Sequence, residues 1–535
     1  MAAAQGSLTH LMELHAAWPR SFVTAAVMIG GCALLWAWAV VLWVRGFSRL
    51  AGVPGPLPLP GIGHLYLKDV TQIMKLLASM RKRYGSVFHF WPGPEPILVV
   101  AESTDVRQIL TDVTKFPKGA DYTNKFSVVF GNGLVTSNGA RHKKDRGCLN
   151  KFFVRSQIEK QQQAITEQTT EAIDEFLEPK VGEEVDIAKF FHMLALRIFG
   201  RFSVSHDYAK DPCAETINHI VCWGSHVIGE HIVLGIPVWD VFPRVRKLKK
   251  CVQVVHDHVN TLIDARVALQ AAAADAASTS GAESEAAVAA AAAVPDDSLS
   301  AMLEAKMERQ DIVEQLTTLL SAGHDTTAFF GCYMVHLLAQ HPRVQQKLKD
   351  EIRDVLGAGP DAPGVDPSKP ILPEHVHALK YVRCVLQEVL RMYPVIPNLT
   401  RNCVADTTLN TSGVTVKAGT RVLVSNTLLN RDARVWENPG EFQPERFAEL
   451  CTSSAGFNSA KHGYMPFGYG SRTCIGNTLA MIEGTIMCTL LMQRYTVEPA
   501  PGFKPRIVPG ISMVSENGIK VILKRDASLT EGGAL

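Results

Sequence analysis

One cysteine near the C-terminal end of the chain has neighbours that suit it to bind a metal. Cys474 lies in FGYGSRTCIG, residues 467–476, with a glycine on each side and an arginine two residues before it. Glycine lets the backbone turn sharply and approach a flat ligand closely. A helical pattern starts just after the cysteine, and the amides of a helix N-terminus favour the thiolate over the thiol. We therefore expect a thiolate metal ligand at Cys474 rather than a buried structural cysteine.

The same ten residues match a known haem-binding pattern. The pattern F-x-x-G-x-R-x-C-x-G is typical of the cytochrome P-450 monooxygenases, and every specified position agrees: Phe467, Gly470, Arg472, Cys474 and Gly476. The chain resembles the microsomal, or class II, members of that family. The resemblance implies haem b (iron protoporphyrin IX) as cofactor and Cys474 as axial ligand of its iron. Arg472, a permanent cation, is suited to a carboxylate.

A second motif lies in a long helical pattern over residues 311–339. Residues 322–327 read AGHDTT, and glycine and threonine in mid-helix weaken the backbone ladder. We expect a local bulge there that can hold a water or a small diatomic ligand. Asp325 and Thr326 provide an acid and an alcohol side by side, which can relay protons. Polar residues facing solvent are the alternative, but the motif resembles the family's oxygen-activation motif and predicts Asp325 and Thr326 as catalytic.

A third set of residues resembles the family's structural triad. Glu388 and Arg391 are three residues apart in a helical pattern over 376–391, so they share a face and can pair. Arg446 follows in FQPERF, residues 442–447. The resemblance implies a buried network of these three residues that supports the cysteine loop and takes no part in catalysis.

Two further haem contacts follow from the resemblance. Arg401 lies ten residues after Arg391, where many members carry an arginine that binds a haem propionate. Arg146 occupies the arginine place of the W-x-x-x-R motif, but His142 stands where tryptophan is usual. We expect Arg146 to contact the haem, and His142 to replace the indole donor only in the right tautomer.

The segments that would form the substrate pocket by resemblance are apolar, which predicts a lipophilic substrate. The predicted pocket residues are Phe116, Phe126, Phe130, Leu319, Ala322, Val395, Ile396, Ile511 and Met513. Residues 122–133 resemble the substrate loop of sterol 14-demethylases, yet those enzymes commonly have histidine where this chain has Asp325. Our first expectation is a sterol or related lipid that is not 14-demethylated. Fatty-acid or xenobiotic hydroxylation is the alternative.

The N-terminal region predicts a membrane anchor. Residues 22–44 carry no charge, and a helix of that length would span about 34 Å, enough to cross a bilayer core. A cleaved signal peptide would have a shorter apolar core. We expect a short lumenal N-terminus at 1–20, a transmembrane signal-anchor at 21–44, a proline-rich hinge at 45–63 and a cytoplasmic catalytic domain at 64–535. The expected location is the endoplasmic reticulum membrane, with a single pass.

The rest of the chain reads as one mainly helical body with a minor β region. A hairpin is predicted from runs at 86–91 and 97–100, a smaller strand pattern at 415–424, and a helix at 475–494. Between these elements, residues 265–294 are mostly alanine and lack a large apolar face. We expect this insertion to be exposed, and either disordered or a frayed helix. The resemblance places the haem between the 311–339 helix and the helix after the cysteine loop.

Composition and resemblance together predict the partners. A formal net charge of +2 argues against nucleic acid, and eleven scattered cysteines without a CxxC pair indicate a reducing compartment. By resemblance, electrons come from NADPH-cytochrome P-450 reductase, with cytochrome b5 as a further donor, and O2 is a substrate. The basic run Arg141, Lys143, Lys144, Arg146 and Lys151 is either a solvated helix face or a docking surface for an acidic reductase. Two other functions remain open: a peroxide isomerase that needs no reductase, and a non-enzymatic haem sensor.

Overall fold

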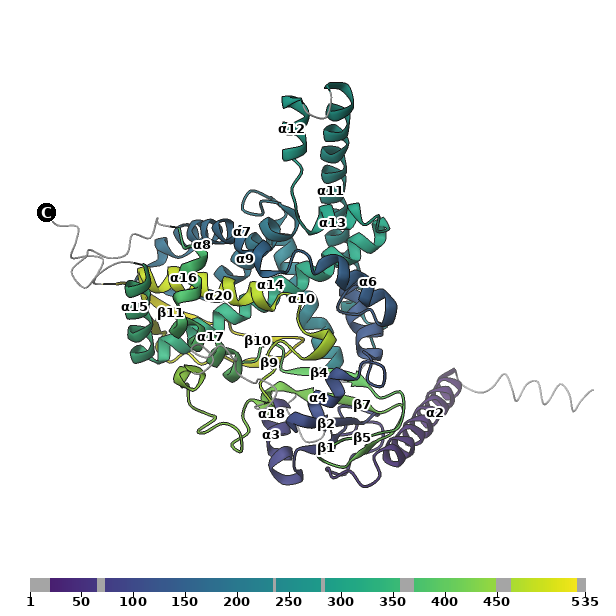
Figure 1. Cartoon of the computed structure of the whole chain (residues 1–535). Helices are drawn as coiled ribbons and strands as arrows, with labels where there is room; N and C mark the ends of the chain where they lie inside the picture. Colours follow the sequence, from purple (N-terminus) through teal and green to yellow (C-terminus); the bar gives the residue numbers. More distant parts are fainter. Residues whose placement is uncertain are drawn as a thin grey trace, which may run out of the picture.

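The computed structural model describes residues 20–64, 73–233, 237–280, 284–356, 370–448 and 463–526 (Figure 1). Helices dominate this part of the chain. The α-helices are α2 (Arg20–Arg49), α3 (Ile73–Tyr84), α4 (Ser103–Thr111), α5 (Ser127–Phe130), α6 (Gly139–Leu149), α7 (Arg155–Lys160), α8 (Gln162–Phe176), α9 (Ile187–Phe199), α10 (Ala214–Val233), α11 (Pro243–Ser280), α12 (Glu285–Ala292), α13 (Ser298–Glu304), α14 (Arg309–Gln340), α15 (Pro342–Leu356), α16 (Pro373–Ala378), α17 (Lys380–Met392), α18 (Asn426–Leu429) and α20 (Asn477–Arg494). Short π or 3-10 turns are η3 (Asp121–Phe126), η4 (Glu178–Lys180), η5 (Gly200–Val204), η6 (Pro444–Phe447) and η7 (Gly470–Arg472).

The strands form small sheets. They are β1 (Val87–Phe90), β2 (Ile97–Val100), β3 (Glu184–Asp186), β4 (Asn398–Asn402), β5 (Thr407–Thr408), β6 (Thr415–Val416), β7 (Arg421–Ser425), β8 (Tyr495–Pro499), β9 (Ile507–Pro509), β10 (Met513–Ser515) and β11 (Lys520–Arg525). The largest described sheet has the order β1-β2-β7-β4, and the others are β3-β11-β8, β10-β9 and β5-β6. The predicted hairpin is confirmed, since Val87 pairs with Val100 in antiparallel register. The predicted fold class, mainly α with a minor β region, is also confirmed.

Helix α14 runs through the centre of the molecule, beside α9 and α20 (Figure 1). Most of its side chains are buried, because apolar residues occur on nearly all its faces. It ends at Gln340, and Pro342 starts the next helix. The predicted helix at 311–339 is therefore confirmed within two residues at each end.

The helix predicted at 376–391 is two helices in the structure. The chain leaves the helical conformation at Leu379, which caps both α16 and α17. The predicted helix at 475–494 begins two residues later than expected, since the cysteine loop extends to Gly476.

Helix α2 is long and apolar, and residues Thr24–Arg49 have the length and composition to cross a membrane. Its apolar side chains, such as Val27, Leu34 and Trp36, are largely exposed to solvent. The helix continues five residues into the range predicted as hinge, because the first proline after it is Pro54. The predicted lumenal segment 1–20 lies outside the described residues except for Arg20.

The alanine-rich insertion is helical in its described part, so of the two alternatives, disorder and a frayed helix, the structure has a helix. Helix α11 continues to Ser280 and helix α12 covers Glu285–Ala292. The two helices lie side by side and project from the body (Figure 1). Alanine has the highest helix propensity of any residue, which here outweighs the missing apolar face.

Candidate functional site

The cysteine loop is a tight turn that joins η7 to helix α20. Gly468 and Gly470 adopt positive φ angles of 75° and 74°, which strain other residues. A Cβ on Gly470 would also lie 2.9 Å from the carbonyl oxygen of Leu110. The amide of Cys474 donates to the carbonyl of Phe467 at 2.8 Å and closes the loop. The predicted Phe467 and Gly470 therefore shape this turn.

The Cys474 side chain lines a cavity of about 330 Å³ between α14 and the cysteine loop. Burial raises the pKa of its thiol, while the Gly476 amide and the Arg146 charge oppose the rise. The Gly476 amide thus favours the thiolate, as expected, but in the chain alone desolvation has the larger effect on the pKa. A coordinated metal cation deprotonates a thiol outright.

Three cations line the same cavity. They are Lys118, Arg401 and Arg472. Burial, with the charges of Arg401, Arg472 and Arg146, holds the pKa of Lys118 well below its usual range. Among the described residues, no ion pair involves these three side chains; Lys118 donates to the Val135 carbonyl and Arg472 to the Ser137 carbonyl. A ligand with two negative charges would compensate two of these three basic groups.

Arg146 and His142 lie behind the cavity and do not line it. Arg146 donates from Nη1 to the carbonyl of Thr473 at 2.7 Å, so it holds the residue before the cysteine. His142 is buried in α6, and burial together with Arg472 and Lys118 lowers its pKa to about 3. His142 is therefore neutral, so only one of its two ring nitrogens can donate a hydrogen bond.

Helix α14 presents the predicted acid and alcohol to the cavity. The hydroxyl of Thr326 donates to the Ala322 carbonyl at 2.7 Å, and the helix runs unbroken through both residues. The predicted bulge is wrong, because this hydroxyl bond is added to the backbone ladder and does not replace it. Asp325 is buried and accepts a hydrogen bond from the Ser512 hydroxyl at 2.6 Å. Burial raises its pKa to about 6, and the bond from Ser512 opposes the rise.

Glu483 of α20 is a buried acid at the cavity wall that sequence reasoning missed. The hydroxyl of Thr327 donates to its Oε2 at 3.1 Å. Burial raises the pKa of Glu483 to about 8, against the effect of the Thr327 hydrogen bond. A lone glutamate after Ile482, on the buried side of an otherwise apolar helix, was the signal that could have identified it.

This pKa predicts how stability depends on pH. The folded-state pKa of Glu483 lies above its ordinary 4.5, so ionisation costs stability as pH rises from about 5 to about 8. Glu483→Gln keeps the acceptor for Thr327 and lacks the charge. We expect the melting temperature of this variant, relative to that of the unmodified protein, to increase as pH rises from 5 to 9. Glu374→Gln, at an exposed carboxyl, is the matched control. A difference that stays constant over this pH range would contradict the assignment.

Glu388, Arg391 and Arg446 form a buried network away from the cavity. Arg391 donates to both Glu388 oxygens, at 2.6 and 2.8 Å, and Arg446 donates to the same carboxylate at 3.1 Å. Arg391 also donates to the carbonyls of Asn430, Pro439 and Glu441. The network ties helix α17 to the segment that precedes the cysteine loop.

Removing Arg391 would leave the buried Glu388 carboxylate with Arg446 as its only ion-pair partner among the described residues, and would leave three carbonyls without this donor. We expect Arg391→Ala to lower the free energy of unfolding by about 3–5 kcal/mol. The measurement is a urea titration followed by haem loss, and a lower free energy of unfolding appears as a lower urea concentration at the midpoint. Arg343→Ala, on the exposed side of α15, should leave the midpoint unchanged. Equal midpoints for both variants would refute the structural role.

Seven of the nine predicted pocket residues line the cavity with Cys474: Phe126, Phe130, Leu319, Ala322, Val395, Ile396 and Ile511. Met513 lines an adjoining cavity of about 510 Å³, which shares Phe126 and Ile511 with the first. The prediction for Phe116 is wrong. Its ring is fully buried in the core cluster beside Leu110 and Val106, since the chain turns towards the cavity only after Pro117.

Comparison with known proteins agrees with this geometry. The family model described as Cytochrome P450 matches residues 53–522. "Putative cytochrome P450 CYP13A2" of Caenorhabditis elegans is 28% identical over 503 residues, which cover 87% of this chain and 91% of that protein. "Cytochrome P450 4d2" of Drosophila melanogaster is 25% identical over 504 residues, or 92% and 96% of the two chains. The match to the family model over most of the chain means that this protein belongs to the cytochrome P450 family of haem-containing monooxygenases.

Proposed function

We propose that this cytochrome P450 is a membrane-anchored haem-thiolate monooxygenase with Cys474 as the axial ligand of its iron. The observation that carries the proposal is that Cys474 lines the same cavity as Ala322 and Thr326 of α14. The described residues fit haem in two ways. One thiol among them lines the cavity, and the three cations Lys118, Arg401 and Arg472 suit the two propionate carboxylates.

The bound haem supplies the redox chemistry that activates O2 for insertion of one oxygen atom into substrate. The protein contributes binding and proton transfer. Asp325, held by Ser512, is a buried acid that can give up a proton near neutral pH. The Thr326 hydroxyl donates its hydrogen bond to the Ala322 carbonyl, so its oxygen lone pairs remain able to accept a hydrogen bond in the cavity. The Arg146 bond to Thr473 fixes the residue before the ligand.

The substrate that we propose is lipophilic, and a sterol or related lipid other than a 14-demethylation substrate is our first choice. The support is the apolar and aromatic lining of the cavity, which includes Phe126, Phe130 and Ile511. Fatty acids and xenobiotics are the second choice, since the same lining excludes neither.

A lipid screen tests this proposal. Full-length, haem-loaded protein is titrated with sterols, fatty acids and apolar xenobiotics, and the low- to high-spin shift of the haem spectrum is recorded. We expect a shift with a sterol-like lipid, and hydroxylated product containing one atom of labelled O2 when NADPH and reductase are added. Turnover of a lipid hydroperoxide without NADPH would favour a peroxide isomerase. Bound haem without NADPH-driven turnover of any lipid would favour a sensor.

The proposed electron donors are NADPH-cytochrome P-450 reductase and cytochrome b5. Lys143, Lys144 and Lys151 are exposed on or next to α6, while Arg141 is engaged with Asp311 at 2.7 Å. The same helix carries Arg146, which touches the cysteine loop. An acidic partner attracted to these lysines would therefore approach the Cys474 side of the cavity.

We further propose that α2 anchors the protein in the endoplasmic reticulum membrane with the catalytic body in the cytoplasm. The support is the length of the apolar helix and its exposed side chains. Deleting residues 1–44 should release the protein from membranes and leave the body folded and haem-loaded, as measured by sedimentation and the haem spectrum. A truncated chain that fails to bind haem would contradict the division into anchor and body.

A further inference from the structure

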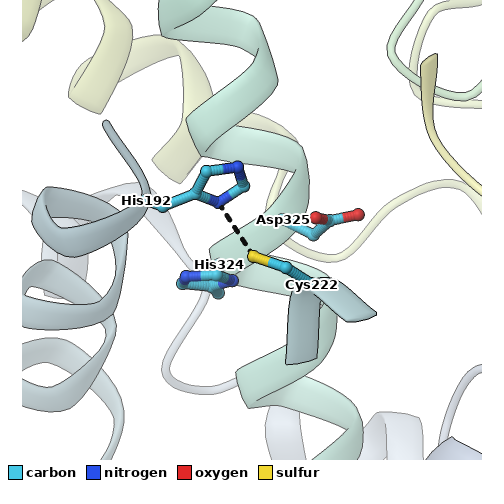
Figure 2. A group of neighbouring side chains, drawn as sticks. All are labelled: His192, Cys222, His324 and Asp325. Atoms are coloured by element: carbon cyan, nitrogen blue, oxygen red, sulfur yellow. Dashed lines mark hydrogen bonds between the residues drawn. The ribbon is translucent and has the colours of Figure 1, made fainter. Parts of the chain in front are cut away.

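Four ligand-type side chains meet in the interior beside the cavity. They are His192 of α9, Cys222 of α10, and His324 and Asp325 of α14, and Figure 2 shows them converging from these helices. One ligand atom from each lies within 4.8 Å of the others. In the proposed function only Asp325 has a role, so three of these residues have no assigned purpose.

His324 is oriented as a metal ligand. Its Nε2 lies 2.8 Å from Oδ1 of Asn218, an acceptor, and this contact is a hydrogen bond in the tautomer with the proton on Nε2 and the lone pair on Nδ1. Nδ1 is buried and has no hydrogen-bond partner. An imidazole whose outer nitrogen is fixed by an acceptor, with the inner nitrogen free, is the usual arrangement of a metal-binding histidine.

The other two donors are also suited to a metal. Cys222 Sγ lies 3.4 Å from Nδ1 of His192, and this contact is the dashed line in Figure 2. Burial lowers the pKa of His192 to about 4, and burial together with the charge of His192 holds the pKa of His324 well below its usual range. An interaction with the main chain of His192 raises the pKa of His324 and so opposes this lowering. It does not meet hydrogen-bond geometry at Nδ1 of His324. The neutral imidazole is the form that binds metals, and each ring offers one nitrogen to the group.

We propose that His192, Cys222, His324 and Asp325 form a binding site for a divalent zinc-class metal ion. Two imidazoles, a thiolate and a carboxylate are ligands that Zn²⁺ accepts in tetrahedral sites. Ligand atoms around such an ion lie about 3.5 Å apart, so the observed spread of up to 4.8 Å needs only sub-ångström movements. On binding, the Cys222 thiol releases its proton to solvent.

Metal binding at this site would inhibit the enzyme. Coordination by Asp325 competes with the hydrogen bond from Ser512 and fixes the carboxylate in its unprotonated form. This half of the inference rests on the proposed proton relay, whereas the binding half depends on the four side chains alone.

Zinc binding is measured directly on the full-length, haem-loaded protein. After dialysis against Zn²⁺, elemental analysis should give one zinc per chain. X-ray absorption at the zinc edge should show one sulfur at about 2.3 Å and nitrogen or oxygen ligands at about 2.0–2.2 Å. Iron absorbs at a different edge, so the haem does not interfere.

Variants separate this site from others. Asn218→Ala removes the residue that orients His324 and should weaken zinc affinity about 10–100-fold. Cys222→Ser removes a ligand, so it should weaken zinc affinity more than Asn218→Ala does and should remove the sulfur signal. Cys213→Ser and His219→Gln alter exposed residues near the start of α10 and are the matched controls. The haem spectrum of each variant checks that it is folded. The group His206, Asp211 and His258 is the competing site, and His258→Gln removes it.

Several results would overturn the inference. A sulfur-free zinc shell, zinc that is lost with His258→Gln but kept with Cys222→Ser, or no stoichiometric binding would each refute the metal site. For the inhibitory half, zinc should slow product formation with NADPH and reductase in the unmodified protein and not in Cys222→Ser. Stoichiometric, sulfur-ligated zinc without inhibition would refute the link to Asp325 and leave the metal site standing.

Discussion

Cys474→Ala is expected to abolish the absorbance band of the reduced carbon monoxide complex that is characteristic of thiolate-ligated haem, and all NADPH-driven turnover with it. Cys474 is the cysteine of the described residues that lines the cavity, so no other described thiol can replace it there. The three cations remain in the variant and can still bind propionates. Haem is therefore expected to bind more weakly, without the electron donation that favours O–O cleavage.

Cys148→Ser is the control for the loss of a thiol. Cys148 is half-buried in α6, and it contacts the Ala301 carbonyl away from the cavity. Its replacement should leave the carbon monoxide spectrum unchanged. If Cys474→Ala kept the thiolate spectrum, the iron ligand would have to be sought elsewhere and the proposed function would fail.

Thr326→Ala should uncouple NADPH consumption from product formation. General acid–base groups contribute about 10²–10⁴-fold to rate, and we expect product formation to fall by about 10²-fold. NADPH consumption should fall much less, with hydrogen peroxide released in place of hydroxylated product. Thr326→Ser keeps the hydroxyl and should restore coupling. Peroxide and product yields per NADPH are the measurement.

Helix α20 offers a matched control for this substitution. The Thr485 hydroxyl donates to the Met481 carbonyl at 2.7 Å, as Thr326 does to Ala322, but Thr485 does not line the cavity. Thr485→Ala removes the same helical hydrogen bond and should keep normal coupling. Equal coupling in the two alanine variants would show that the Thr326 hydroxyl has no part in proton delivery.

The sequence predicted the parts of the site that are continuous in the chain. Cys474 and its glycines lie in one loop, and Asp325 and Thr326 lie in one helix whose apolar pattern is unmistakable. Local spacing is enough in such cases, because the motif and the element that carries it coincide.

The missed residues come from distant elements or depend on burial. Lys118 is an ordinary surface-type residue by sequence, and only the fold brings it to Arg401 and Arg472. His192 and Cys222 are thirty residues apart in the chain, and neither belongs to a recognisable ligand motif. The prediction for Phe116 was wrong because an aromatic ring in a segment that borders a pocket can equally pack into the core.

The parallel pairing of β2 with β7 sets an order of events during synthesis. Leu98 pairs with Val422, so a strand that is synthesised early cannot pair until a strand more than three hundred residues later has been synthesised. Strand β4, which carries Arg401, pairs with the same late strand. Loop closure over such a span is slow, and nothing can complete this sheet until the ribosome has passed Ser425. Insertion of the prosthetic group must therefore follow translation of nearly the whole polypeptide. A nascent chain that stalls before that point cannot bind it.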